Sequence, residues 1–94
     1  MTKYLIAHVR QGGQNMIIFP LDASFGGQSN HAQEALMRTF HLAAAGAGLA
    51  GHVVVIWRSE DRTYFRAPYA WHSFFTSPDA YTFVMGNLNK ELTI

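Results

Sequence analysis

Two apolar runs flank a helical pattern in the stretch of residues 16–57, MIIFPLDASFGGQSNHAQEALMRTFHLAAAGAGLAGHVVVIW. It opens with the apolar run Met16–Phe19 and closes with the apolar run Val53–Trp57. Both runs are apolar on each face, which is typical of strands at the centre of a sheet. Between them, apolar residues recur at helical spacing and predict a helix from His31 to Ala45. If the two strands are neighbours, the intervening helix makes them parallel, because a parallel pair needs a crossover connection.

Glycines after this helix spell a familiar pattern. Gly46, Gly48 and Gly51 form G-x-G-x-x-G, the signature of dinucleotide-binding loops. In such loops the glycines follow a strand and open a helix, whereas here they end a helix and lead into a strand. We therefore interpret them as a helix C-cap with close backbone packing. At the other end of the helix, Ser29 or Asn30 is suited to cap its first turn.

The flanking segments complete a plan of order ββαββα. Residues Tyr4–Arg10 alternate in polarity and predict a first strand. Thr63–Arg66 predicts a fourth strand after a polar turn, and Pro78–Lys90 predicts a second helix. We expect one α+β domain over residues 1–94, with a four-stranded sheet of order 1-2-3-4 and two helices. The first and fourth strands carry His and Arg residues, as edge strands often do.

The composition favours a protein that acts by binding. Of the 94 residues, 49% are hydrophobic, none is cysteine, and the net charge is +1. Charged residues make up 14%, against roughly 25% in ordinary globular domains. We therefore expect another molecule to cover part of the surface. The absence of cysteine excludes disulfides and thiol chemistry.

The apolar pattern of the second and third strands predicts a homodimer. The second and third strands are apolar on both faces, and we expect the two helices to cover one face only. The other face would then pack against a second copy of the chain. The candidate seam residues are Ile17, Phe19, Val54 and Ile56.

The densest candidate site combines arginine and aromatic residues after the third strand. Arg62, Tyr64 and Arg66 share one face of the fourth strand by the period of two. Arg, Tyr and Trp are enriched at protein-binding hot spots, so we expect a protein partner. The alternative is RNA or single-stranded nucleic acid, bound by stacking and phosphate contacts, although a net charge of +1 is far from a basic footprint. The predicted partner-binding residues are Arg58, Arg62, Tyr64, Arg66, Tyr69 and Trp71.

A second alternative is a small anionic ligand, or an enzyme site, at the loop before the first helix. Free backbone N–H groups at the start of a helix attract anions. The loop lacks the lysine of phosphate-binding loops, and its residues also suit a simple helix entry. The candidate ligand-binding residues are Gly26, Gly27, Ser29, Asn30 and His31.

Other chemistry has little support in the sequence. No two histidines stand four apart on one helix, so we predict no metal site and no cofactor. The G-x-S-x-G elbow of hydrolases is missing, and the adjacent Glu60 and Asp61 suit an exposed turn. The apolar run after Met1 is shorter than a signal peptide requires, and no run is long enough to span a membrane. We therefore expect a small, soluble, cytoplasmic binding protein without catalytic activity.

Overall fold

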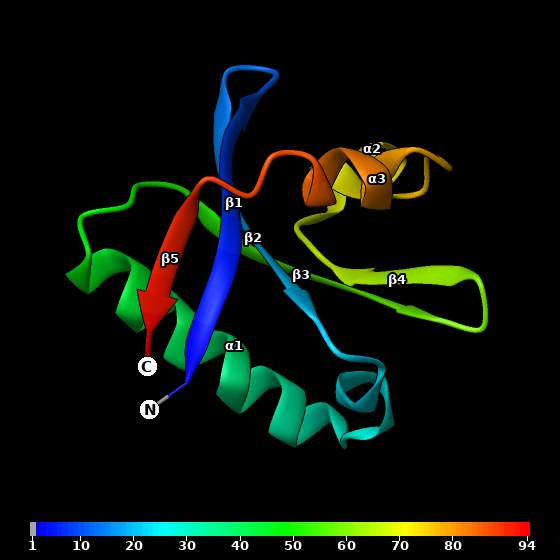
Figure 1. The fold of residues 1–94 in the computed structure, drawn as a ribbon, viewed down its shortest axis with the longest axis horizontal. Helices are drawn as coiled ribbons and strands as arrows, with labels where there is room; N and C mark the ends of the chain where they lie inside the picture. The colour runs from blue at the N-terminus through cyan, green and yellow to red at the C-terminus, as the bar shows by residue number, and fades with distance from the viewer. Residues whose placement is uncertain (1) are drawn as a thin grey trace.

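The computed structural model describes residues 2–94, which form a five-stranded mixed sheet with helices on both faces (Figure 1). The strands run in the order β4-β3-β2-β1-β5 across the sheet. Their bounds are β1 Lys3–Gln11, β2 Gln14–Leu21, β3 His52–Ser59, β4 Arg62–Arg66 and β5 Lys90–Thr93. The helices are the 3-10 turn η1 Ala23–Gly27, α1 Asn30–Gly46, the 3-10 turn η2 Tyr69–Trp71, α2 His72–Phe75 and α3 Ala80–Met85.

The central strand pairing is as predicted. β2 and β3 are parallel, with Ile17 opposite Val53, and α1 connects them. A two-residue turn joins the two strands of each hairpin. All four turn residues have positive φ, which is the conformation of tight turns that match the twist of a hairpin. These turn residues are Gly12 and Gly13 in the first hairpin, and Glu60 and Asp61 in the second. The predicted order of the first four strands is therefore confirmed.

The end of the chain differs from the prediction. The helix expected over Pro78–Lys90 stops at Met85, and β5 then pairs with β1 in antiparallel orientation. Gly86 and the two asparagines after it are poor helix formers, and the side chain of Asn89 bonds to the backbone of His8 instead. The expected order ββαββα with four strands is thus incomplete. β1 lies inside the sheet and is not an edge strand.

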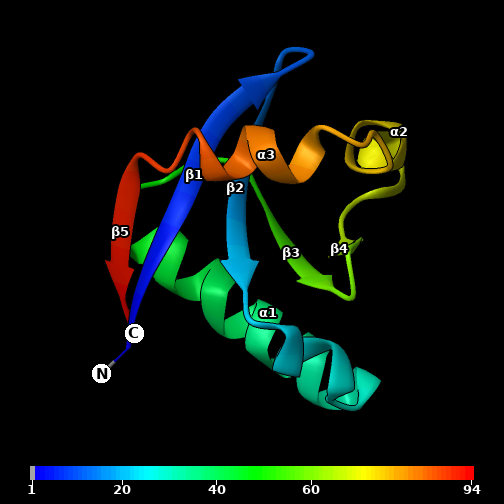
Figure 2. The ribbon, with the colours of Figure 1, turned by 45° about the vertical axis from the view of Figure 1, so that its right-hand side comes forward.

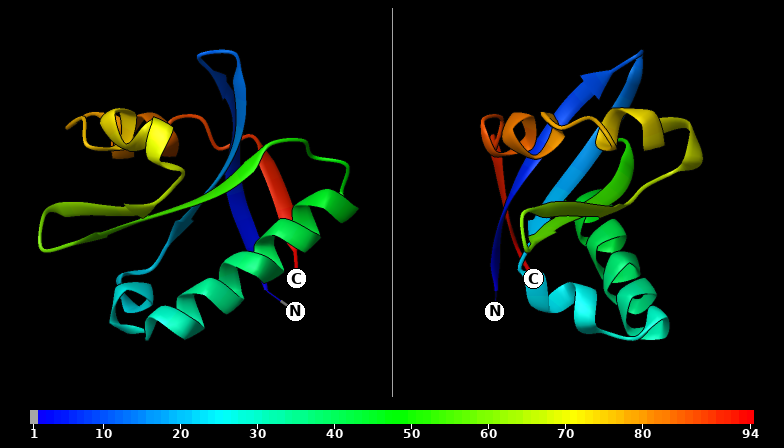
Figure 3. Two further views of the ribbon diagram at one scale, coloured as in Figure 1. Left: turned by 180° about the vertical axis from the view of Figure 1, so that it is seen from behind. Right: turned by 90° about the vertical axis from the view of Figure 1, so that its right-hand side faces the viewer.

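The helices lie on opposite faces of the sheet, as Figures 2 and 3 show. On one face, Phe40 and Ala44 of α1 pack against Ile17, Phe19 and Val55. On the other face, residues of α2 and α3 pack against the alternate side chains of the same strands, among them Ile18, Val54 and Ile56.

This arrangement corrects the predicted dimer seam. The four seam residues Ile17, Phe19, Val54 and Ile56 are all 0–1% exposed within a single chain. The expectation of a bare sheet face was wrong because the short helices α2 and α3 cover it. A dimer of this chain must therefore use a different surface.

Candidate functional site

The most exposed aromatic side chain among residues 2–94 lies in the connection from β4 to α2. Pro68 and η2 form a short turn there, which we call the Tyr69 turn (residues 68–71). The Tyr69 side chain is 88% exposed, and its ring lies 5.4 Å from the ring of His72. Proline presets its own φ and the following residues wind into a single 3-10 turn, so the tyrosine is presented on a compact support.

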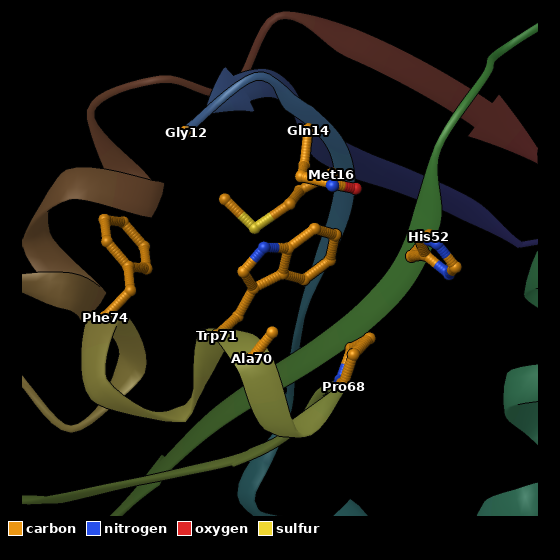
Figure 4. A pocket seen from close by; sticks show the side chains of 8 residues that line it. All are labelled: Gly12, Gln14, Met16, His52, Pro68, Ala70, Trp71 and Phe74. Carbon is orange, nitrogen blue, oxygen red and sulfur yellow. The ribbon is translucent and has the colours of Figure 1, made fainter.

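A cleft of about 560 Å³ lies on one side of the Tyr69 turn (Figure 4). We call it the hairpin cleft, since the tip of the β1–β2 hairpin forms one of its walls. Trp71 and Phe74 point into it from η2 and α2, and the buried Met16 of β2 lies between them. Apolar side chains dominate the wall, and Gln14 and His52 supply the polar groups. The full lining is Gly12, Gln14, Met16, His52, Pro68, Ala70, Trp71 and Phe74.

A second cleft of about 550 Å³ lies on the other side of the turn, against α1. We call it the helix cleft. Arg66 lies in its wall and donates a hydrogen bond from Nη1 to Oε1 of Gln33, at 3.1 Å. Its Nη2 lies 3.5 Å from Oε1 of Glu34. The full lining is Glu34, Met37, Val53, Phe65, Arg66, Ala67, Pro68 and His72.

The six residues predicted to bind a partner do not form one surface. Arg66, Tyr69 and Trp71 lie around the Tyr69 turn. Arg62 and Tyr64 share the α1 side of β4 with Arg66, as the period of two predicts, and Tyr64 stacks on Trp57 at 5.8 Å.

Arg58 lies on the opposite face of the sheet from that group. Its guanidinium carbon lies 5.4 Å from the ring centre of Tyr81, beside α3. The single recognition surface expected from the sequence is therefore divided, because successive residues along a strand alternate between the two faces and Arg58 pairs with Thr63.

The loop before α1 serves mainly to start the helix. The Ser29 hydroxyl accepts a hydrogen bond from the backbone N–H of Ala32, which makes it the N-cap. Gly26 packs against the Trp57 indole, where a Cβ would lie 2.5 Å from Nε1. Asn30 donates to Glu34 within the helix.

The remaining loop residues offer little charge for an anion. Gly27 contributes to a depression of about 470 Å³ with no basic residue in its lining. His31 is exposed on the first turn of α1. The local geometry thus accounts for Gly26, Ser29 and Asn30 without a bound anion.

Two histidines, His8 and His72, form hydrogen bonds with the backbone. The Nε2 atom of His8 lies 2.9 Å from the carbonyl oxygen of Ala50, and that of His72 lies 2.9 Å from the carbonyl oxygen of Ala67. Within residues 2–94, no group of three or more His, Asp or Glu side chains is placed to hold a metal ion. The described helices are also too short or too polar to cross a membrane.

Sequence reasoning missed the partners of Trp71 in the hairpin cleft. Gln14, Met16 and His52 come from strands β2 and β3, and they reach Trp71 only because the parallel register sets Met16 opposite His52. The aromatic cluster around residues 69–75 was a visible signal for one wall. The opposite wall had none, because it depends on contacts between distant parts of the chain.

No protein-family model, curated protein or solved structure matches this chain at a significant level. Its class therefore rests on the geometry alone. It is a small α+β domain with a mixed sheet covered on both faces, and its surface carries an exposed tyrosine turn between two clefts.

Proposed function

We propose that this chain is a protein-interaction domain that acts by binding, and that its contact surface is the Tyr69 turn with the hairpin cleft. The observation that carries the proposal is the 88% exposure of Tyr69 beside a cleft walled by Trp71 and Phe74. When a partner covers a large aromatic ring that is exposed to water, the free energy of the system falls. Aromatic anchors and pockets of this kind are typical of the centres of protein interfaces.

The first partner we propose is a second copy of the chain. A twofold interface is self-complementary, so one patch must carry both the protruding group and its receptor. The Tyr69 turn meets this requirement, because Ala70 and Trp71, the two residues that follow Tyr69 in the turn, line the cleft. The cleft lining includes no Asp, Glu, Lys or Arg, so it suits an uncharged aromatic ring. A protein partner of another kind would use the same anchor and cleft.

The proposal predicts a dimer that depends on Tyr69. Light scattering at about 100 μM should give the mass of a dimer for the native chain, since modest interfaces have micromolar dissociation constants. Tyr69→Ser should give a monomer. Ala70→Glu should do the same, because it places a charge in the apolar cleft. Leu42→Ser is the matched control, because Leu42 is 67% exposed but lies on α1, and it should leave the dimer intact.

Two results would count against this interface. A native chain that stays monomeric at this concentration excludes the second copy as the partner. A dimer that survives both Tyr69→Ser and Ala70→Glu places the contact on another surface.

Two further hypotheses stand beside this proposal. Bases of single-stranded nucleic acid could stack on Tyr64 of β4, whose ring stacks on Trp57 of β3. Arg62 lies on the same face of β4 as Tyr64. The net charge of +1 weakens this hypothesis, because surfaces that bind nucleic acid are usually basic. A small anionic ligand at the Gly26–Asn30 loop is less well supported, because the loop's polar groups already cap α1.

A further inference from the structure

We infer that the helix cleft binds a small amphipathic carboxylate, with Arg66 as the anchor for the carboxylate and the apolar wall as the seat for its hydrophobic body. This inference does not depend on the proposed dimer, because the helix cleft shares only Pro68 with the lining of the hairpin cleft. It rests on the incomplete pairing of Arg66, on the position of Glu34, and on the chemistry of the cleft wall.

Arg66 is a partly buried cation with unused donors. Its side chain is 27% exposed, so most of its hydration has been lost. A guanidinium has five N–H donors, and among residues 2–94 the Arg66 side chain makes one hydrogen bond, to Gln33. That bond holds the guanidinium in place while it leaves other N–H groups free. A cation in this state favours an anion that can accept two hydrogen bonds at once.

Glu34 pairs only loosely with the Arg66 guanidinium. Its carboxylate oxygen lies 3.5 Å from Nη2 of Arg66, which is longer than a charge-assisted hydrogen bond, and the Glu34 side chain is 53% exposed. Exposed pairs of this kind contribute little free energy. A ligand carboxylate that keeps its contact with the apolar wall can therefore displace Glu34 into solvent.

The rest of the cleft wall suits a hydrophobic body. Met37 of α1, Val53 of β3 and Phe65 of β4 line the wall from three elements. His72 adds an imidazole whose Nε2 is bonded to the backbone of Ala67, and its ring packs at 5.2 Å from that of Phe65. The combination of one fixed cation and an apolar wall selects an anion attached to an apolar group over a free inorganic anion.

The test uses 2-naphthoate as the probe and its uncharged amide, 2-naphthamide, as the matched control. Titrations followed by NMR of the Met37 and Ala67 backbone amides give the dissociation constants. The carboxylate should bind the native chain about tenfold more tightly than the amide, as expected for a charge-assisted hydrogen-bonded pair. Performing the titrations also in Tyr69→Ser keeps the result independent of dimer formation.

Three variants then identify the anchor. Arg66→Gln should weaken naphthoate about tenfold and leave naphthamide unchanged. Glu34→Gln should tighten naphthoate about threefold, because it removes the competing negative charge from the cleft lining and keeps a side chain of the same size. Arg62→Gln removes the same charge from the same face of β4, outside the cleft lining, and should leave both probes unchanged.

Three outcomes would overturn the inference. Equal affinity for the carboxylate and the amide would show that Arg66 does not anchor the ligand. Equal weakening by Arg62→Gln and Arg66→Gln would show an effect of net charge alone. Glu34→Gln keeps the test decisive even if Arg66→Gln fails to fold, because a loss of naphthoate binding in Glu34→Gln contradicts the proposed competition.

Discussion

Gly51 is a residue whose backbone conformation the tertiary structure requires. It has a φ of +134°, and a Cβ at this position would lie 2.6 Å from the carbonyl oxygen of Asn15. The approach is close because β2 and β3 begin side by side, with Met16 opposite His52. Gly48, with a φ of +78°, ends α1 in the left-handed conformation. The interpretation of G-x-G-x-x-G as a helix end with close backbone packing is therefore confirmed at these two positions.

The close contact at Gly51 predicts a large effect of a single methyl group. Gly51→Ala should lower the free energy of unfolding by about 3 kcal/mol, because it combines an unfavourable φ with a backbone clash. Gly46→Ala is the control. No neighbouring atom lies within 4 Å of a Cβ built at Gly46, so the change should stabilise α1 by about 0.5 kcal/mol. Urea denaturation measures both, and equal effects of the two variants would contradict the prediction.

At the scale of elements, Asn89 determines how the chain ends. Its Oδ1 accepts a hydrogen bond from the backbone N–H of His8, and its Nδ2 donates to the carbonyl oxygen of His8, both at 2.9 Å. The backbone N–H of Asn89 also donates to the carbonyl oxygen of Ile6. The asparagine side chain thus acts as a further rung between β1 and the segment that leads into β5.

Loss of this bridge should loosen β5. Asn89→Ala removes two hydrogen bonds and should cost about 2 kcal/mol of unfolding free energy. Hydrogen exchange should also become faster at the β5 amides. Asn87→Ala is the matched control, because the Asn87 side chain donates one hydrogen bond within the α3 region, to Phe83. If both variants exchange β5 amides at the same rate, the bridge does not hold the strand.

At the scale of the whole molecule, the same two strands support two cores. β2 and β3 direct alternate side chains to opposite faces, so α1 packs on one set while α2 and α3 pack on the other. Phe40 stacks on Phe19 at 4.1 Å on the first face, and Phe75 packs at 5.5 Å from Phe65 on the second. Because the strands are shared, unfolding of one core should remove the support of the other.

The shared strands predict a single cooperative unfolding transition. Phe40→Leu and Phe75→Leu should each lower the free energy of unfolding by about 1.5 kcal/mol through altered packing. In each variant, circular dichroism and tryptophan fluorescence should report the same unfolding midpoint. Leu42→Ala, at an exposed position of α1, should change stability by less than about 0.5 kcal/mol. If Phe75→Leu leaves stability unchanged, the helices α2 and α3 do not belong to the cooperative unit.

Sequence patterns predicted the elements whose signals are local. Residues close together in the chain determine four of these features. They are the alternation of β1, the cap of α1 at Ser29, the turn at Glu60 and Asp61, and the helix that makes β2 and β3 parallel. Local interactions of this kind can be read from spacing and residue type.

Sequence patterns did not predict the last strand, the faces that the helices cover, or the two clefts. Asn89 meets His8 across 81 residues, and Arg66 meets Gln33 across 33. The site residues Gln14, Met16 and His52 join Trp71 in the same way. Contacts between such distant residues leave no periodic pattern, since they arise from the packing of whole elements against each other.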